Sequence, residues 1–295
     1  MINPLMSMII CLSESSPSIE NYIKLINEFY SGFGYHLQIE GEPFKYKDIE
    51  EIFKLLKSLN IKDVGVRTSC DVKFEHLEMI KKYDLRSVMF HWEDEDIWGK
   101  LRDARKLGIS TEVSVIMDDE TISKFNEIIN ICRSNNVDLI VMERGIISKY
   151  RNKNNELTTN IDYEKMMKKI VEHNVSNNDI GIALSHCPNK ILLHPERNNH
   201  VLGGCSAGIV SCAISDNGDI IPCLPLFDVK LGNIENDDIE DIWNNNEILR
   251  QLRNRENLCG KCSGCEFREA CGGCRAEGYY RGEGLFAEDK TCWKK

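Results

Sequence analysis

The sequence lacks an apolar run near the ~20 residues that a membrane-spanning helix needs. Its apolar N-terminus, residues 1–12, has no basic flank and no small-residue cleavage site, so it predicts a buried strand, not a signal peptide. Positive charge is scarce: 37 Lys and Arg against 47 Asp and Glu leave a net charge of −10. Binding to phosphates needs clustered Lys and Arg, so we expect no nucleic-acid partner, no membrane attachment and a cytoplasmic location.

Cysteine is abundant and unevenly spread. Of 13 cysteines, four lie in residues 1–204 and nine in residues 205–295. A secreted disulfide framework would have a signal peptide and an even cysteine count, and neither is present. Dense cysteines in a cytosolic chain indicate metal binding more often than disulfides. We therefore expect a first domain over 1–204 and a metal-binding domain over 205–295.

The first domain has the pattern of an α/β protein. Short apolar or β-branched runs alternate with segments whose apolar residues recur at helical spacing. Six such β-α units indicate a parallel sheet with helices outside, as an open sheet or a partial barrel. Ser16 and Pro17 resemble an N-cap and first helical residue. The expected strands are 8–12, 35–40, 64–68, 87–91, 111–117 and 139–142, followed by a polar loop at 146–160, a helix near 163–173 and a strand near 180–184.

The C-terminal domain begins with a hairpin pattern. Asn217-Gly218 suits a type I′ turn, and the hairpin would bring Cys212 and Cys223 near each other. A helix containing Trp243 is expected over 239–253. After it, cysteines recur at gaps short enough for their thiolates to converge on one metal centre. Nearby glycines would let the backbone approach sulfide atoms closely; they are Gly264, Gly272 and Gly273.

These segments resemble the SPASM domain, the C-terminal extension of radical SAM enzymes. The resemblance covers 205–292 and rests on Cys205-x12-Gly218-x4-Cys223, Cys262-x2-Cys265-x5-Cys271-x2-Cys274 and Cys292. It implies two auxiliary [4Fe–4S] clusters with crossed ligand sets, and leaves Cys259 as a spare and Cys212 as the least certain ligand. A zinc ribbon remains the alternative for these cysteines. The implied sets are Cys205, Cys212, Cys223 and Cys274 for cluster I, and Cys262, Cys265, Cys271 and Cys292 for cluster II.

The first domain resembles the partial (β/α)6 barrel of radical SAM enzymes, with one important departure. That family binds its catalytic cluster through Cys-x3-Cys-x2-Cys after the first strand, whereas residues 12–17 here contain no cysteine. The Gly-Gly-Glu-Pro segment that contacts SAM in the family begins here with Glu40, a carboxylate expected to oppose SAM. Gly41, Glu42 and Pro43 are therefore either a residual SAM contact or a plain turn. We expect a pseudo-radical-SAM protein that does not cleave SAM.

Three functions remain open from the sequence. The first is an accessory protein for modification of a ribosomally made peptide or a protein, binding that substrate or an active radical SAM enzyme. The second is an enzyme whose redox chemistry runs on the auxiliary clusters. The third is an active radical SAM enzyme whose cluster is completed by another chain or by a non-cysteine ligand.

Overall fold

The computed structural model describes residues 4–61, 63–69, 71–94, 96–146, 162–176, 180–193 and 204–294. It divides into two compact units. The first comprises Met1–Ser114, Asn135–Asp138 and Ala207–Leu249, and the second comprises Val115–Ser134, Leu139–Ser206 and Arg250–Lys295. Residues after Cys205 occur in both units, so the domain boundary before Cys205 stays a prediction.

The first unit is built on a mostly parallel sheet. Strands β1 to β5 follow one another in sequence order, β8 pairs in parallel with the other edge of β1, and β9 and β10 continue antiparallel. The strands are β1 (Ser7–Leu12), β2 (His36–Gly41), β3 (Val64–Arg67), β4 (Ser87–His91), the first part of β5 (Ser110–Met117), β8 (Ser211–Ile214), β9 (Asp219–Ile221) and β10 (Gly232–Asn233).

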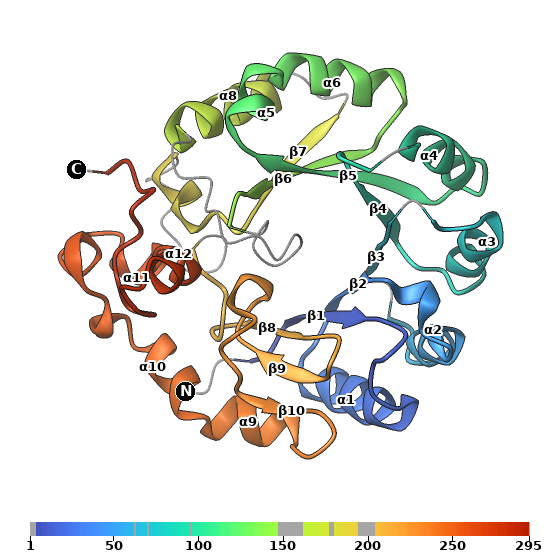
Figure 1. Cartoon of the computed structure of the whole chain (residues 1–295), viewed down its shortest axis with the longest axis horizontal. Coiled ribbons are helices and arrows are strands. Elements are labelled where there is room, and N and C mark those ends of the chain that lie inside the picture. Colours follow the sequence, from blue (N-terminus) through green and yellow to red (C-terminus); the bar gives the residue numbers. More distant parts are fainter. Residues whose placement is uncertain are drawn as a thin grey trace. The chain divides into compact units, whose positions relative to one another are not determined.

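Helices α1 to α4 lie on the outer side of strands β1 to β4 (Figure 1). They are amphipathic, and their buried residues recur at helical spacing, as with Tyr22, Ile26 and Phe29 of α1. The helices of this unit are α1 (Ile19–Gly32), η1 (Pro43–Lys45), α2 (Ile49–Ser58), α3 (Phe74–Lys82), α4 (Ile97–Lys106), η4 (Leu224–Leu226), α9 (Ile239–Asn245) and the start of α10 (Glu247–Arg253).

Strand alternation gives this sheet one apolar face and one polar face. The register aligns Ile10, Ile39, Val66 and Val88 in one row across the sheet, and all four are buried. The neighbouring row on the opposite face includes Glu40, Arg67, Met89 and Glu112. This polar row is buried as well.

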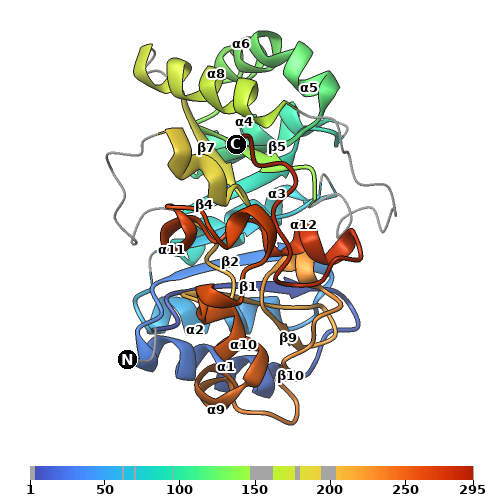
Figure 2. The same cartoon turned by 90° about the vertical axis from the view of Figure 1, so that its left-hand side faces the viewer.

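The second unit carries the parallel pair β6 (Leu139–Arg144) and β7 (Gly181–Ser185). Helices α6 and α8 lie side by side in both views (Figures 1 and 2). The short helix η2 packs on α11 through a cluster that includes Ile191, Phe267 and Ala270. The helices are α5 (Asp119–Ser123), α6 (Phe125–Ser134), α8 (Tyr163–Ser176), η2 (Pro188–Leu193), η5 (Arg255–Asn257), η6 (Gly260–Cys262), α11 (Arg268–Cys271) and α12 (Arg275–Tyr280).

The α/β class and all six predicted β-α units are confirmed, with local corrections. The N-cap of α1 is Ser18, not Ser16. The predicted helix over 239–253 is broken at Asn246, whose Oδ1 accepts from the backbone N–H groups of Ile248 and Leu249 and so caps α10. Most of the predicted loop at 146–160 lies outside the described residues, as does Cys70.

The predicted hairpin also forms, with a different turn. Gly218 N–H donates to Ser215 O at 2.9 Å, and Gly218 has φ +79°, whereas Asn217 is absent from the residues with positive φ. A type I′ turn would require positive φ at both central residues, so the loop is a type I turn followed by a left-handed glycine. Among the described residues, no helix combines the length and the apolar character required to cross a membrane.

Candidate metal centre

Four cysteines of the second unit line one cavity of about 270 Å³. They are Cys262, Cys265, Cys271 and Cys292, the four predicted for cluster II. Cys262 ends η6 and Cys271 ends α11, while Cys265 lies in the turn between these short helices. Cys292 comes from the C-terminal segment, where its N–H donates to Asp289 O at 3.1 Å. Short loops thus deliver three of the thiols, and a segment distant in sequence delivers the fourth.

The rest of the cavity wall is mixed. Leu192, Leu258 and Phe267 line it, together with Gly272 and Gly273. Polar and charged residues also line it: Asn189, Lys261, Glu266, Arg268, Asp289 and Lys294. A β-carbon on Gly273 would stand 3.4 Å from the Cys262 sulfur, so a larger residue would intrude on the thiol.

The cavity favours a metal that binds soft ligands. Burial is the main factor raising the pKa of Cys271 to about 12, and the nearby thiols of Cys292 and Cys262 raise it further. A thiolate at such a site needs positive charge beside it, which a bound metal supplies. The donor set and the glycine-lined wall therefore fit an iron–sulfur cluster. Among the described residues, no three His, Cys, Asp or Glu side chains are grouped as a site for a single metal ion.

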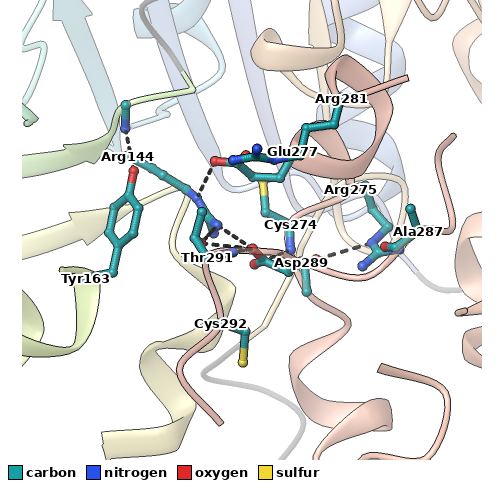
Figure 3. Close-up of polar contacts among 12 residues, drawn as sticks. Arg144, Tyr163, Cys274, Arg275, Glu277, Arg281, Ala287, Asp289, Thr291 and Cys292 are labelled. Carbon is teal, nitrogen blue, oxygen red and sulfur yellow. Dashed lines mark hydrogen bonds and ion pairs between the residues drawn. The ribbon is translucent and has the colours of Figure 1, made fainter. Parts of the chain in front are cut away.

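Cys274 faces away from this cavity. Gly272 and Gly273 have φ of +68° and +59°, so the chain turns through two left-handed residues between Cys271 and Cys274. Cys274 does not line the cavity and instead precedes α12. In Figure 3 its sulfur lies on the Glu277 side of a polar network, whereas the sulfur of Cys292 points away from that network.

Cys205 lies close to Cys274. Its N–H donates to Cys271 O at 2.8 Å, and Arg255 Nη2 donates to Cys205 O at 2.9 Å. Burial raises the pKa of Cys274 to about 12, Arg144 opposes that rise, and the Cys205 thiol adds to it. The second unit thus brings Cys205 and Cys274 together as a group separate from the four-cysteine cavity.

The other two predicted cluster I residues, Cys212 and Cys223, belong to the first unit. Cys212 on β8 pairs with Met8 of β1, on the apolar face of the sheet that also carries Ile214. Cys212 is 2% exposed, and burial raises its pKa to about 12. Cys223 follows β9 and precedes η4, at the same end of the hairpin. Neither unit contains all four predicted cluster I residues.

The remaining described cysteines stand apart from the cavity. Cys259 is exposed and its thiol contacts Asn257 O at 3.5 Å. Cys11, Cys132 and Cys187 are buried. Burial alone raises the pKa of Cys132 to about 12, as expected for a thiol in an apolar interior. Burial is also the main factor raising the pKa of Cys187 to about 12, where Arg144 opposes the rise.

The loop between β1 and α1 is compact and held by hydroxyl groups. Ser13 N–H donates to Ser16 Oγ at 2.9 Å, and Ser16 Oγ donates to Asp216 O at 2.9 Å. Gly41 ends β2 with φ +83°, and a β-carbon there would stand 2.6 Å from Leu12 O. Glu42 pairs with Lys45, and Pro43 begins η1. Gly41, Glu42 and Pro43 therefore form a tight turn beside the serine loop.

Glu40 is neutralised within the sheet. Its carboxylate accepts from Arg67 Nη1 at 3.0 Å, and both side chains are less than one-tenth exposed. Arg67 also contacts the sulfur of Met89, at 3.0 Å from Nε and 2.9 Å from Nη2. The residue expected to oppose SAM by its charge is thus part of a buried ion pair. On the same sheet His91 Nδ1 lies 2.7 Å from Ser114 Oγ.

Sequence reasoning missed the buried arginine at the end of β6. Arg144 is wholly buried and pairs with Asp289 at 2.6 Å and Glu277 at 3.3 Å, while also contacting Thr291 (Figure 3). Its guanidinium lies 5.1 Å from the centre of the Tyr163 ring. The predicted strand stopped at Met142, two residues short, because a charged pair after an apolar run indicates a strand end.

Comparison with known proteins agrees with this geometry. A family model, SPASM, described as an iron–sulfur cluster-binding domain, matches residues 205–266. The AdoMet-dependent heme synthase of Nitratidesulfovibrio vulgaris is 38% identical over 89 residues, which cover 30% of this chain and 24% of that protein. The mycofactocin maturase MftC of Mycolicibacterium smegmatis is 36% identical over 92 residues, covering 30% and 23%. The chain thus spans about a quarter of the length of the curated relatives it matches.

The similarity in fold extends beyond the segment that is matched in sequence. Streptococcus suis SuiB bound to its precursor peptide SuiA matches 100% of this chain and 77% of its own, with a TM-score of 0.80 and 16% identity. SuiB has also been solved bound to S-adenosylmethionine. Residues 205–266 thus match the SPASM iron–sulfur cluster-binding domain, and the chain as a whole has the fold of SuiB. Its β1–α1 loop contains no cysteine.

Proposed function

We propose that this chain is an iron–sulfur accessory protein, or pseudo-enzyme, in the modification of a ribosomally made peptide or a protein. It would bind the peptide or an active radical SAM partner and would not itself cleave SAM. The observation that carries the proposal is a pair of features in one chain. The cavity retains four thiols, and the β1–α1 loop is closed by serines in place of cysteines.

The proposed metal content is two [4Fe–4S] clusters in a SPASM domain at residues 205–295. The first ligand set draws on Cys205, Cys223 and Cys274, with Cys212 or Cys259 as the fourth ligand. The second set is the cavity group, Cys262, Cys265, Cys271 and Cys292. The positions of Cys205 beside Cys274, and of the other four around one cavity, support the crossed assignment. Bound clusters would supply one-electron redox capacity.

The peptide part of the proposal draws on the relatives. MftC is named as a maturase of mycofactocin, and SuiB binds a precursor peptide. The chain's matches to these proteins cover the SPASM segment in sequence and the whole chain in fold. The buried Glu40–Arg67 pair supports the pseudo-enzyme part, because it fills the polar face of the sheet with a satisfied ion pair.

Iron and sulfide analysis of the anaerobically reconstituted protein tests the metal content. We expect about eight iron atoms per chain with matching sulfide and a broad absorption band near ~400 nm. Stoichiometric zinc without sulfide would refute the SPASM cluster assignment. Cys265→Ala should lose about four iron atoms, whereas the nearby exposed Cys259→Ala should retain all of them. Loss of iron in Cys259→Ala but not in Cys212→Ala would make Cys259 the fourth ligand of the first cluster.

Reduction with dithionite in the presence of SAM tests the pseudo-enzyme part. We expect no 5′-deoxyadenosine above the no-enzyme control. Catalytic production of 5′-deoxyadenosine by this chain alone would overturn the proposal in favour of an active radical SAM enzyme. Redox turnover of a peptide without SAM would instead favour an enzyme whose redox chemistry takes place at its auxiliary clusters.

A further inference from the structure

Buried charged groups surround Cys274. Two arginines, Arg144 and Arg275, and two carboxylates, Glu277 and Asp289, are buried there, and the partly exposed Arg281 pairs with Glu277 at 3.3 Å. Arg144 and Arg275 are each at most 1% exposed. Buried guanidinium groups at such positions need their hydrogen-bond donors satisfied.

Three guanidinium nitrogens in this region are also unsatisfied. Arg144 Nη1, Arg275 Nη2 and Arg281 Nε are buried and have no hydrogen-bond partner among the described residues. The remaining nitrogens of Arg144 and Arg275 are bonded: Arg144 to Asp289 and Glu277, and Arg275 to the carbonyls of Gly273, Leu285 and Ala287. The bonded nitrogens fix each guanidinium in place, and the free ones are rigid donors that need acceptors.

The free donors of Arg144 and Arg275 each belong to an arginine beside one cysteine group. The Cys274 thiol and the Arg144 guanidinium affect each other's pKa, since the cation lowers the thiol's pKa and the thiolate raises the cation's. Arg275 Nη2 stands 2.6 Å from where a β-carbon on Gly273 would lie, and the Cys262 sulfur stands 3.4 Å from the same point. Arg144 is thus next to the Cys205–Cys274 group, and Arg275 Nη2 is next to the cavity group.

We propose that Arg144 and Arg275 are positioning residues for the two clusters, each donating a hydrogen bond to sulfur and balancing the negative charge of the nearer cluster. The inference rests on the proposed iron–sulfur function. Sulfur atoms and thiolates are hydrogen-bond acceptors, and four thiolate ligands would bring negative charge beside each arginine. Net charge and hydrogen bonds to sulfur set the reduction potential of such clusters. A nearby cation stabilises the more negative, reduced state, so each arginine raises the potential of its own cluster.

Arg144, the last residue of β6, also contacts the segment around Cys274 through Asp289. Asp289 accepts from Arg144 Nη2 at 2.6 Å and from the Cys274 backbone N–H at 3.0 Å, and it lines the cavity of the second cysteine group. Removing Arg144 alone would leave the buried Asp289 carboxylate without its ion pair. The test therefore pairs Arg144→Gln with Asp289→Asn, which removes one positive and one negative charge and keeps an oxygen as acceptor for the Cys274 N–H. The net charge is then unchanged, so this double variant tests the hydrogen bond to sulfur, whose loss also lowers the potential.

EPR-monitored redox titration of the full chain, with iron analysis alongside, measures the effect. In R144Q/D289N we expect full iron and a tenfold shift toward the oxidised form for one cluster, equivalent to about 59 mV for a one-electron couple. In R275Q the larger shift should fall on the other cluster. Arg281→Gln is the matched control, because it removes the same charge from the more exposed partner of Glu277 and should shift neither cluster comparably. Unchanged potentials in R144Q/D289N and R275Q at full iron would overturn the inference.

If the variants do not fold, a measurement on the wild-type protein still tests the inference. The chain is labelled with guanidino-¹⁵N arginine and its reduced clusters are examined by pulsed EPR. We expect hyperfine coupling from arginine nitrogen at both clusters, and its absence would overturn the inference. A protein that binds no iron and sulfide at all would instead refute the proposed function, so the two failures are distinct.

Discussion

The buried pair of Glu40 and Arg67 gives a quantitative prediction for the centre of the first unit. The two charged groups are 3.0 Å apart and almost fully enclosed. At an effective dielectric constant of about 20, two unit charges at this distance attract each other by about 5 kcal/mol. Much of that attraction offsets the cost of removing both groups from water, so the pair as a whole adds little net stability. Removing one partner leaves the other charge buried without this ion pair.

We therefore expect Glu40→Gln and Arg67→Met each to lower the free energy of unfolding by about 3–5 kcal/mol. The double variant should cost at least ~3 kcal/mol less than the sum of the two single variants, because it leaves no buried charge behind. With a urea dependence near ~2–3 kcal/mol per molar, each single variant should lower the urea midpoint by about 1–2 M.

Urea titration followed by tryptophan fluorescence and far-UV circular dichroism measures these effects. Glu51→Gln is the matched control, since Glu51 pairs with Lys54 at 2.6 Å on the same unit but both side chains are about half exposed. It should cost no more than about 0.5 kcal/mol. If Glu40→Gln were as mild as Glu51→Gln, the reasoning about a desolvated pair would be refuted.

Two further predictions concern backbone geometry and pH. Gly272 has φ +68°, and a β-carbon there would overlap Arg255. Gly272→Ala should therefore destabilise the cysteine-rich region by about 1–2 kcal/mol from its left-handed backbone alone, which would be measured as a lower melting temperature. A melting temperature equal to that of the wild type would contradict this. Burial alone would raise the pKa of Asp138, but hydrogen bonds from Thr111 and Arg105 outweigh it and hold the pKa below its usual value. This stability is fully present above the unfolded pKa of about 3.9 and is lost as pH falls through the folded pKa, so Asp138→Asn should flatten the acid side of the stability-versus-pH curve.

The strands and helices were predictable because the periodicity of apolar residues is local information. The rows that include Ile39 and Val66 alternate with polar residues, and the strand bounds came within about two residues of those found. The break at Asn246 was missed because side-chain hydrogen bonds decide it. Asn246 uses its side chain to cap α10 and to donate to Leu231 O, and neither bond has a signal in hydrophobic periodicity.

The candidate site was likewise predictable only in part. Cysteine spacing was sufficient to expect Cys262, Cys265, Cys271 and Cys292 around one centre, and these four line one cavity. Spacing gave no information on the side-chain direction of Cys212, which strand pairing with Met8 places on the apolar face. Arg144 could not be found from sequence, because its partners Glu277 and Asp289 lie more than a hundred residues away in the chain.

The β1–α1 loop and the cysteine-rich region differ in the buried groups that hold them. The loop is held by neutral hydrogen bonds of Ser13 and Ser16, and it needs no metal to satisfy them. The cysteine-rich region has the buried thiol of Cys274 beside the Arg144 guanidinium, with guanidinium nitrogens that have no partner among the described residues. Under the proposed function, bound clusters would supply thiolate and sulfide acceptors to these nitrogens, so removal of the clusters should destabilise the cysteine-rich region more than the loop.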